Sequence, residues 1–150
     1  MFDYEWMDNA MKRLLLLAAL LTTPALAQDT RFLAPLPPAA QETLRKEMLD
    51  NLIALNEIIT LMASNKVREA GEVAELRLGQ TAMGKNAALP YDARPGPQMP
   101  IEMHGLGRDG HAAASAFARA AATGDATKAM AALPRLTGSC VACHALYRTR

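Results

Sequence analysis

Apolar residues recur every three or four positions along two stretches of the chain, which is the period of helices with one buried face. The first stretch runs from about Ala39 to Ser64 without a glycine or proline. We expect its inward face to carry Leu44, Met48, Leu52, Leu55, Ile59 and Met62. The second stretch runs from about Lys66 to Met83, and Gly84 is suited to end it. The pattern therefore predicts two amphipathic helices with a short break between them.

Prolines and alanines divide the second half of the chain. Residues 86–102 contain four prolines, so they cannot form one continuous helix. An alanine-rich stretch predicts a third helix from about Met103 to Ala122. Asp125 can cap a fourth helix from about Ala126 to Arg148, in which Pro134 should cause a kink or delay the start. No alternating run of β-branched residues predicts a strand. The expected fold is all-α, an antiparallel four-helix bundle.

The N-terminus has the pattern of an export signal. Lys12 and Arg13 precede an apolar run from Leu14 to Leu21, and a small-x-small site ends at Ala27. The run is shorter than the roughly 20 residues that span a bilayer. We predict a signal peptide over residues 1–27 and a folded domain over residues 28–150, in the periplasm. An uncleaved anchor is the alternative, and residues 1–10 resemble a mis-assigned start.

Charge and composition narrow the function. The 150 residues include 16 basic and 15 acidic side chains, for a formal charge of +1. Removing the predicted signal raises this charge to about +2, which gives no basic excess of the kind that nucleic-acid binders show. Hydrophobic residues make up 51% of the chain but aromatic residues only 5%. A large flat cofactor would supply the bulk that such a core lacks.

The candidate chemistry is the C-terminal sequence Cys140-Val141-Ala142-Cys143-His144. C-x-x-C-H is the attachment motif of c-type haem, in which two cysteines form thioethers and the histidine binds iron. Positions 140, 143 and 144 share one stripe of a helix. The pattern fits less well with a zinc site completed by His104 and His111, with a thiol-disulfide oxidoreductase, or with a structural disulfide.

A chain of this size that ends in Gly138-x-Cys140-x-x-Cys143-His144-x-x-Tyr147-Arg148 resembles the cytochrome c′ family. The resemblance implies a four-helix bundle that covalently binds one haem c near the end of the last helix. It implies that Cys140 and Cys143 are the thioether sites and His144 the proximal iron ligand. It also implies that Arg148 lies near the proximal side of the haem. The alternative role of Arg148, with equal weight, is a cation that the dipole favours at a helix C-terminus.

The sixth iron ligand decides the function. In low-spin relatives a methionine of the first helix fills this position, and here Met48 follows Arg45 at nearly the family's spacing. The commoner spacing points one residue further, to Leu49, and methionine also serves as ordinary core packing. Two alternatives therefore remain for the sixth position: Met48 binds the iron, or no residue does. His111, Met103 and His104 are weaker candidates.

Two functions follow from these alternatives. With Met48 bound, we expect an electron-transfer cytochrome that meets redox partner proteins. With an open position, we expect a high-spin cytochrome that binds NO or CO. No acid–base residue is identified, so no enzyme activity is expected. Dimers through the first two helices are common among relatives, and Ile53 and Ile58 leave a homodimer open.

The export prediction has a direct test. We expect the mature protein to begin at Gln28, because the small-x-small site ends at Ala27. N-terminal sequencing of the protein from a periplasmic extract checks this. A chain that begins at Met1 or Met11 in the membrane fraction would show an uncleaved anchor instead.

Overall fold

The computed structural model describes residues 28–150. The predicted signal peptide, residues 1–27, lies outside the described residues. Among the described helices, none has the length and apolar character needed to cross a membrane.

The described chain is mostly helical, which confirms the all-α class. Its long helices are α2 (Pro38–Ala63), α3 (Val67–Leu78), α5 (Ile101–Ala122) and α6 (Ala126–Leu146). Between α3 and α5 lie the short α4 (Pro95–Gln98) and two 3-10 turns, Gln80–Ala82 and Tyr91–Ala93. The proline-rich stretch thus forms short turns rather than one helix, as predicted.

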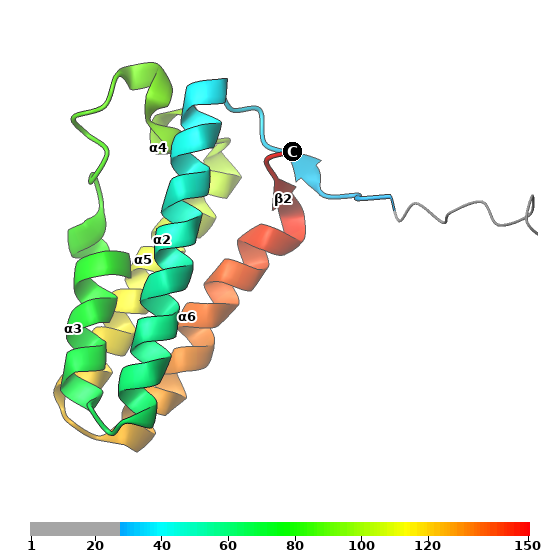
Figure 1. Ribbon diagram of the computed structural model, residues 1–150. Coiled ribbons are helices and arrows are strands. Elements are labelled where there is room, and N and C mark those ends of the chain that lie inside the picture. Colours follow the sequence, from blue (N-terminus) through cyan, green and yellow to red (C-terminus); the bar gives the residue numbers. More distant parts are fainter. Residues whose placement is uncertain (1–27) are drawn as a thin grey trace, which may run out of the picture. The chain divides into compact units, whose positions relative to one another are not determined.

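The long helices pack in series, α2 on α3, α3 on α5 and α5 on α6 (Figure 1). Phe117 of α5 is fully buried and is the one aromatic member of the main core. The same core contains small and branched side chains from all four long helices: Ile58, Val67, Ala70, Ala74, Ala114, Ala121, Ala129 and Leu136. Gly71 allows α3 and α5 to approach closely, since a Cβ there would lie 2.9 Å from the Cβ of Ala121. The alanine-rich faces therefore bring the helices together around one aromatic ring.

Helix α3 ends at Leu78, earlier than the predicted Met83. Gly79 turns the backbone to an extended conformation, and a Cβ at Gly79 would lie 2.6 Å from the Glu75 carboxylate. This carboxylate accepts a hydrogen bond from the backbone N–H of Thr81 at 3.1 Å. The absence of a side chain at position 79 thus lets Glu75 fold over the end of its own helix. Gly84, the predicted end, instead takes a positive φ of 77° in the following turn.

Helix α6 begins at Ala126 and continues through Pro134, so the proline does not delay its start. Asp125 caps the helix as predicted, because its Oδ1 accepts a hydrogen bond from the N–H of Lys128 at 3.1 Å. This hydrogen bond lowers the pKa of Asp125. The cap therefore stabilises the helix above the carboxylate's ordinary pKa, and its contribution is lost as the pH falls through the lowered value.

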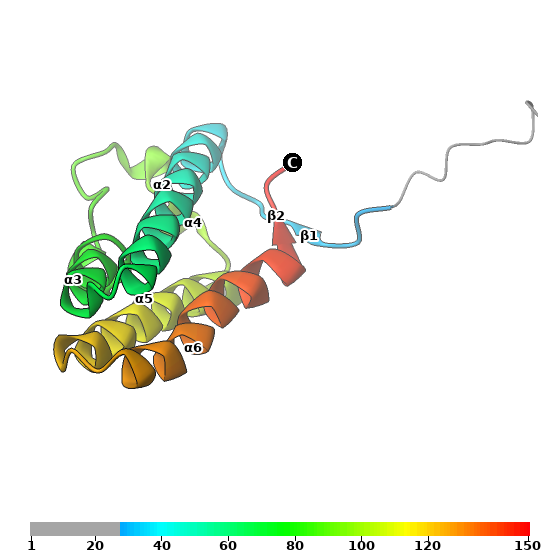
Figure 2. The same cartoon turned by 60° about the horizontal axis from the view of Figure 1, so that its bottom comes forward.

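The prediction of no strand is wrong for two short segments, one before the first long helix and one after the last. Strand β1 (Phe32–Leu33) pairs in parallel with β2 (Tyr147–Arg148), directly after α6. Figure 2 shows the two strands side by side. Strands of two residues are too short to show an alternating pattern, and their pairing joins opposite ends of the domain. Sequence periodicity has no means of detecting such a contact.

The buried face of α2 differs from the predicted stripe. Leu44 is buried, but Leu52 is 64% exposed and Ile59 is 47% exposed, and Ala54 and Ile58 are buried instead. Helix α3 binds the other side of α2, where Arg77 pairs with Glu57 at 2.9 Å. Residues two apart on a helix are rotated by about 200°. Ile59 therefore faces away from Glu57, and α3 cannot cover it.

Candidate functional site

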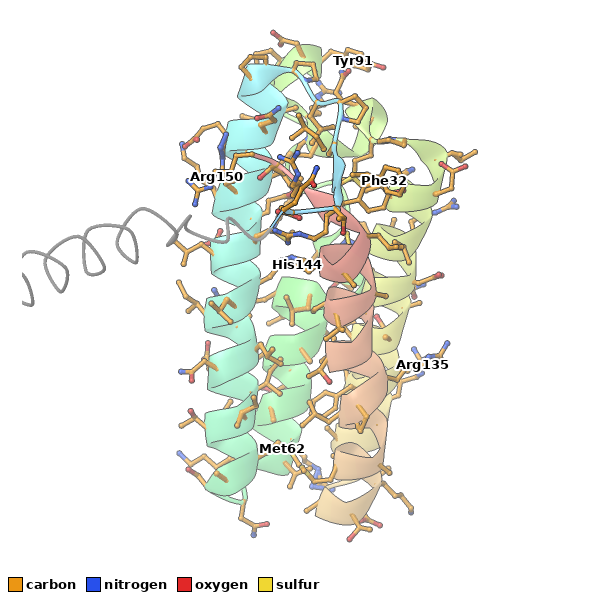
Figure 3. All side chains as sticks on the ribbon, turned by 90° about the vertical axis from the view of Figure 1, so that its right-hand side faces the viewer. Phe32, Met62, Tyr91, Arg135, His144 and Arg150 are labelled. Carbon is orange, nitrogen blue, oxygen red and sulfur yellow. The ribbon has the colours of Figure 1, made fainter. Side chains whose placement is uncertain are left out.

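The last turns of α6 carry the two cysteines and the histidine of the motif. Cys140 and His144 are exposed and lie four residues apart, so they share one side of the helix. In Figure 3, His144 lies at the edge of α6 that is turned toward α2, and Arg135 lies at the opposite edge. Both thiols are free. His144 is thus exposed at the edge of α6 that is turned toward α2, and Cys140 is exposed one turn before it on the same side.

A second apolar cluster surrounds Cys143, and we call it the methionine cluster. Its buried members are Ala34, Leu36, Ala40, Leu44 and Met103, against which Met48, Met99, Cys143 and Tyr147 pack half-buried. Met48 comes from α2 and Cys143 from α6. The structure therefore brings the candidate sixth ligand and one candidate thioether site into the same cluster.

The two thiols differ in their surroundings. Burial in the methionine cluster raises the pKa of the Cys143 thiol, and the neighbouring charge of the Cys140 thiolate raises it further. Cys140 is exposed on the helix surface, and its sulfur lies 3.8 Å from the carbonyl oxygen of Leu136. Because the thiolate is the reactive form, Cys140 is the more accessible nucleophile.

Arg45 has a buried nitrogen without a hydrogen-bond partner among the described residues. This is its Nε, and the nearest carboxylate oxygen, from Glu42, is 3.9 Å away. The Nη2 atom donates a long hydrogen bond of 3.4 Å to Gln41. Arg45 lies three residues before Met48, on the adjacent turn of α2. The sequence indicated Arg45 only by its spacing from Met48. The structure adds that the Nε of Arg45 has no hydrogen-bond partner among the described residues, and such a donor suits an anion.

The other two histidines of the described residues lie on α5. The Nδ1 atom of His111 is 2.8 Å from the carbonyl oxygen of Leu78 and 3.1 Å from that of Gly79, at the end of α3. His104 is exposed on α5 beside Gly96. Over residues 28–150, no three His, Cys, Asp or Glu side chains come together in a way that could hold a metal ion. The zinc hypothesis therefore lacks a ligand set in this part of the chain.

Arg31 and Arg148, from the two ends of the folded domain, interact next to the motif. Arg148 donates from Nε to the carbonyl oxygen of Arg31 at 3.2 Å, in the paired strands. Arg31 donates from Nη1 to the carbonyl oxygen of His144, also at 3.2 Å. The predicted helix to Arg148 therefore ends two residues early, at Leu146, and Arg148 lies in the extended β2, where it contacts Arg31. The contact of Arg31 with His144 spans 113 positions of sequence, and no local pattern indicates it.

Comparison with known proteins adds no relative. No family model matches the chain, and neither the curated proteins nor the solved structures give a match.

The environments of the thiols predict their relative reactivity in protein made without haem. We expect iodoacetamide to modify Cys140 faster than Cys143 near pH 8, because Cys143 is half-buried and its pKa is raised. Raising the pH should reduce the difference between the two modification rates, and unfolding the protein in urea should remove this difference. Peptide mass spectrometry over a time course measures both rates. Equal rates without urea would contradict the described environment of Cys143.

Proposed function

We propose that this chain is a periplasmic monohaem c-type cytochrome that transfers electrons, with the antiparallel four-helix architecture of the cytochrome c′ family. The observation that carries the proposal is the C-x-x-C-H motif on the last turns of α6, with Met48 packed in the same cluster as Cys143. The proposal makes residues 28–150 one haem c domain exported by residues 1–27.

The donor set fits covalent haem. Two free thiols and an imidazole occupy consecutive turns of one helix, and Cys140 and His144 are exposed for reaction. The exposed Leu52 and Ile59 of α2 are an apolar surface that the described residues leave in water. Covering such side chains with an apolar group is favourable by about 25 cal/mol for each Å² buried. A bound haem that reached this face of α2 would gain this favourable burial.

Each site residue has a distinct role in this proposal. Cys140 and Cys143 form the thioether bonds, and His144 binds the iron from the proximal side. The partnerless Nε of Arg45 suits a haem propionate, because arginine binds carboxylates with short charge-assisted hydrogen bonds. Arg148, tied to Arg31, supports the proximal side next to His144.

Met48 is the proposed sixth ligand. It is half-buried in the methionine cluster, whereas His111 is held by carbonyl oxygens at the end of α3. A bound haem would supply an iron that alternates between the ferric and ferrous states and so carries one electron. A thioether ligand favours the ferrous state and raises the reduction potential, which suits electron transfer to a redox partner protein.

A second function follows if Met48 remains a packing residue. Its half-buried place against the methionine cluster is that of an ordinary packing side chain. The sixth position would then be open, and the protein would bind NO or CO.

Haem attachment is tested in a host that carries the attachment machinery. We expect wild-type protein to keep its haem after acid-acetone extraction, because thioether bonds resist it. Cys143→Ala should retain less covalent haem, and the Cys140→Ala/Cys143→Ala double variant should retain none. Ser139→Ala is the matched control on the same helix and should behave as wild type. Equal covalent haem in Cys143→Ala and wild type would overturn the motif assignment.

Optical and EPR spectra of the ferric protein separate the two functions. Met48 ligation predicts a low-spin spectrum with a methionine–iron charge-transfer band, both lost in Met48→Ala. Met62→Ala is the control, since Met62 is a half-buried methionine of α2 that packs against the main core. A high-spin spectrum that Met48→Ala leaves unchanged would instead support the NO- or CO-binding function.

A further inference from the structure

The end of α6 is held by a residue from the opposite end of the domain. The last carbonyl groups of a helix have no partners within it. After α6 the chain becomes extended at Tyr147, whose N–H still bonds the carbonyl oxygen of Cys143. The carbonyl oxygen of His144 accepts its hydrogen bond from Arg31, at 3.2 Å. A guanidinium group at this position also complements the negative end of the helix dipole.

Arg31 begins a segment, residues 31–36, that we call the strap. The strap pairs with the two residues after α6 through β1 and β2, and Ala34 donates its N–H to the carbonyl oxygen of Arg148 at 2.8 Å. The rings of Phe32 and Tyr147 contact each other, with centroids 6.3 Å apart. These contacts hold the chain directly after His144.

The other end of the strap is anchored on α2. Ala34 and Leu36 are only 1% and 5% exposed, and both belong to the methionine cluster with Leu44 and Cys143. The side chain of Gln41 donates to the carbonyl oxygen of Leu36 at 3.0 Å. The strap therefore connects the start of α2 with the end of α6.

This connection matters because α2 and α6 are the two ends of the packing series. Each packs mainly on its own neighbour, α3 or α5, and they approach each other less closely (Figure 2). Met48 lies on α2 and His144 on α6. The strap and the methionine cluster join α2 to α6 at the end of the domain where both candidate ligands lie.

We propose that Arg31 is a positioning residue for His144, and that the strap sets the orientation of this ligand relative to Met48. The proposal rests on the haem function proposed above. Arg31 acts through the backbone of His144 and is not itself a ligand. Its hydrogen bond fixes the last turn of α6, and the strap fixes that turn against α2.

Ferric EPR spectra and reduction potentials of the haem-loaded protein test this role, because both report the ligation of the iron. We expect Arg31→Ala to shift or split the EPR signal and to shift the potential. Arg31→Lys, which can still donate to the His144 carbonyl, should restore the wild-type spectrum. Arg135→Ala removes an exposed cation from the opposite edge of α6 and should match wild type.

The outcomes separate this proposal from the haem function. A wild-type chain without covalent haem would overturn the haem function and the positioning role together. Covalent haem with identical EPR signals in Arg31→Ala and wild type would overturn the positioning role alone, even if the variant unfolds at a lower temperature. If Arg31→Ala does not fold, Arg31→Met keeps a long side chain without the donor to the His144 carbonyl, and the same comparison of EPR signals decides.

Discussion

The burial of Phe117 among small side chains is the contact on which the rest of the domain depends. The ring is fully buried, in a core to which α2, α3, α5 and α6 all contribute. Alanines on these helices allow the backbones to approach. Gly71 has no side chain that would collide with Ala121 between α3 and α5. Because this core and the methionine cluster are separate, the core can hold the helices together while the side chains packed with Cys143 remain half-buried.

Local patterns predicted the helices well but predicted their covered faces less well. The start of α6 at Asp125 followed from a capping residue, whose hydrogen bond lies within one turn. The end of α3 was misplaced because Gly79, not Gly84, is where the chain leaves the helix. Leu52 and Ile59 were assigned to a buried stripe because helical period shows which residues share a face. It does not show how much of that face the neighbouring helices cover.

In the candidate site, too, the local features could be predicted from the sequence and the tertiary contacts could not. Cys140, Cys143 and His144 belong to one short motif, so their common helix could be predicted from spacing, whereas the burial of Cys143 beside two exposed residues could not. The environment of Met48 could be predicted only as an inward position, and the structure adds that Met48 packs against the same cluster as Cys143. Arg31 could not be found from sequence, because its contact with His144 joins two segments at opposite ends of the domain.

The pairing of β1 with β2 has a consequence for the order of folding. Residues so distant in sequence must close nearly the whole chain into a loop, which makes their contact entropically costly and late. During synthesis β2 is also made after all four long helices. The helical core around Phe117 can assemble earlier from neighbouring hairpins, but the strap cannot close until Cys140, Cys143 and His144 have followed. The site is therefore completed in the final step of folding.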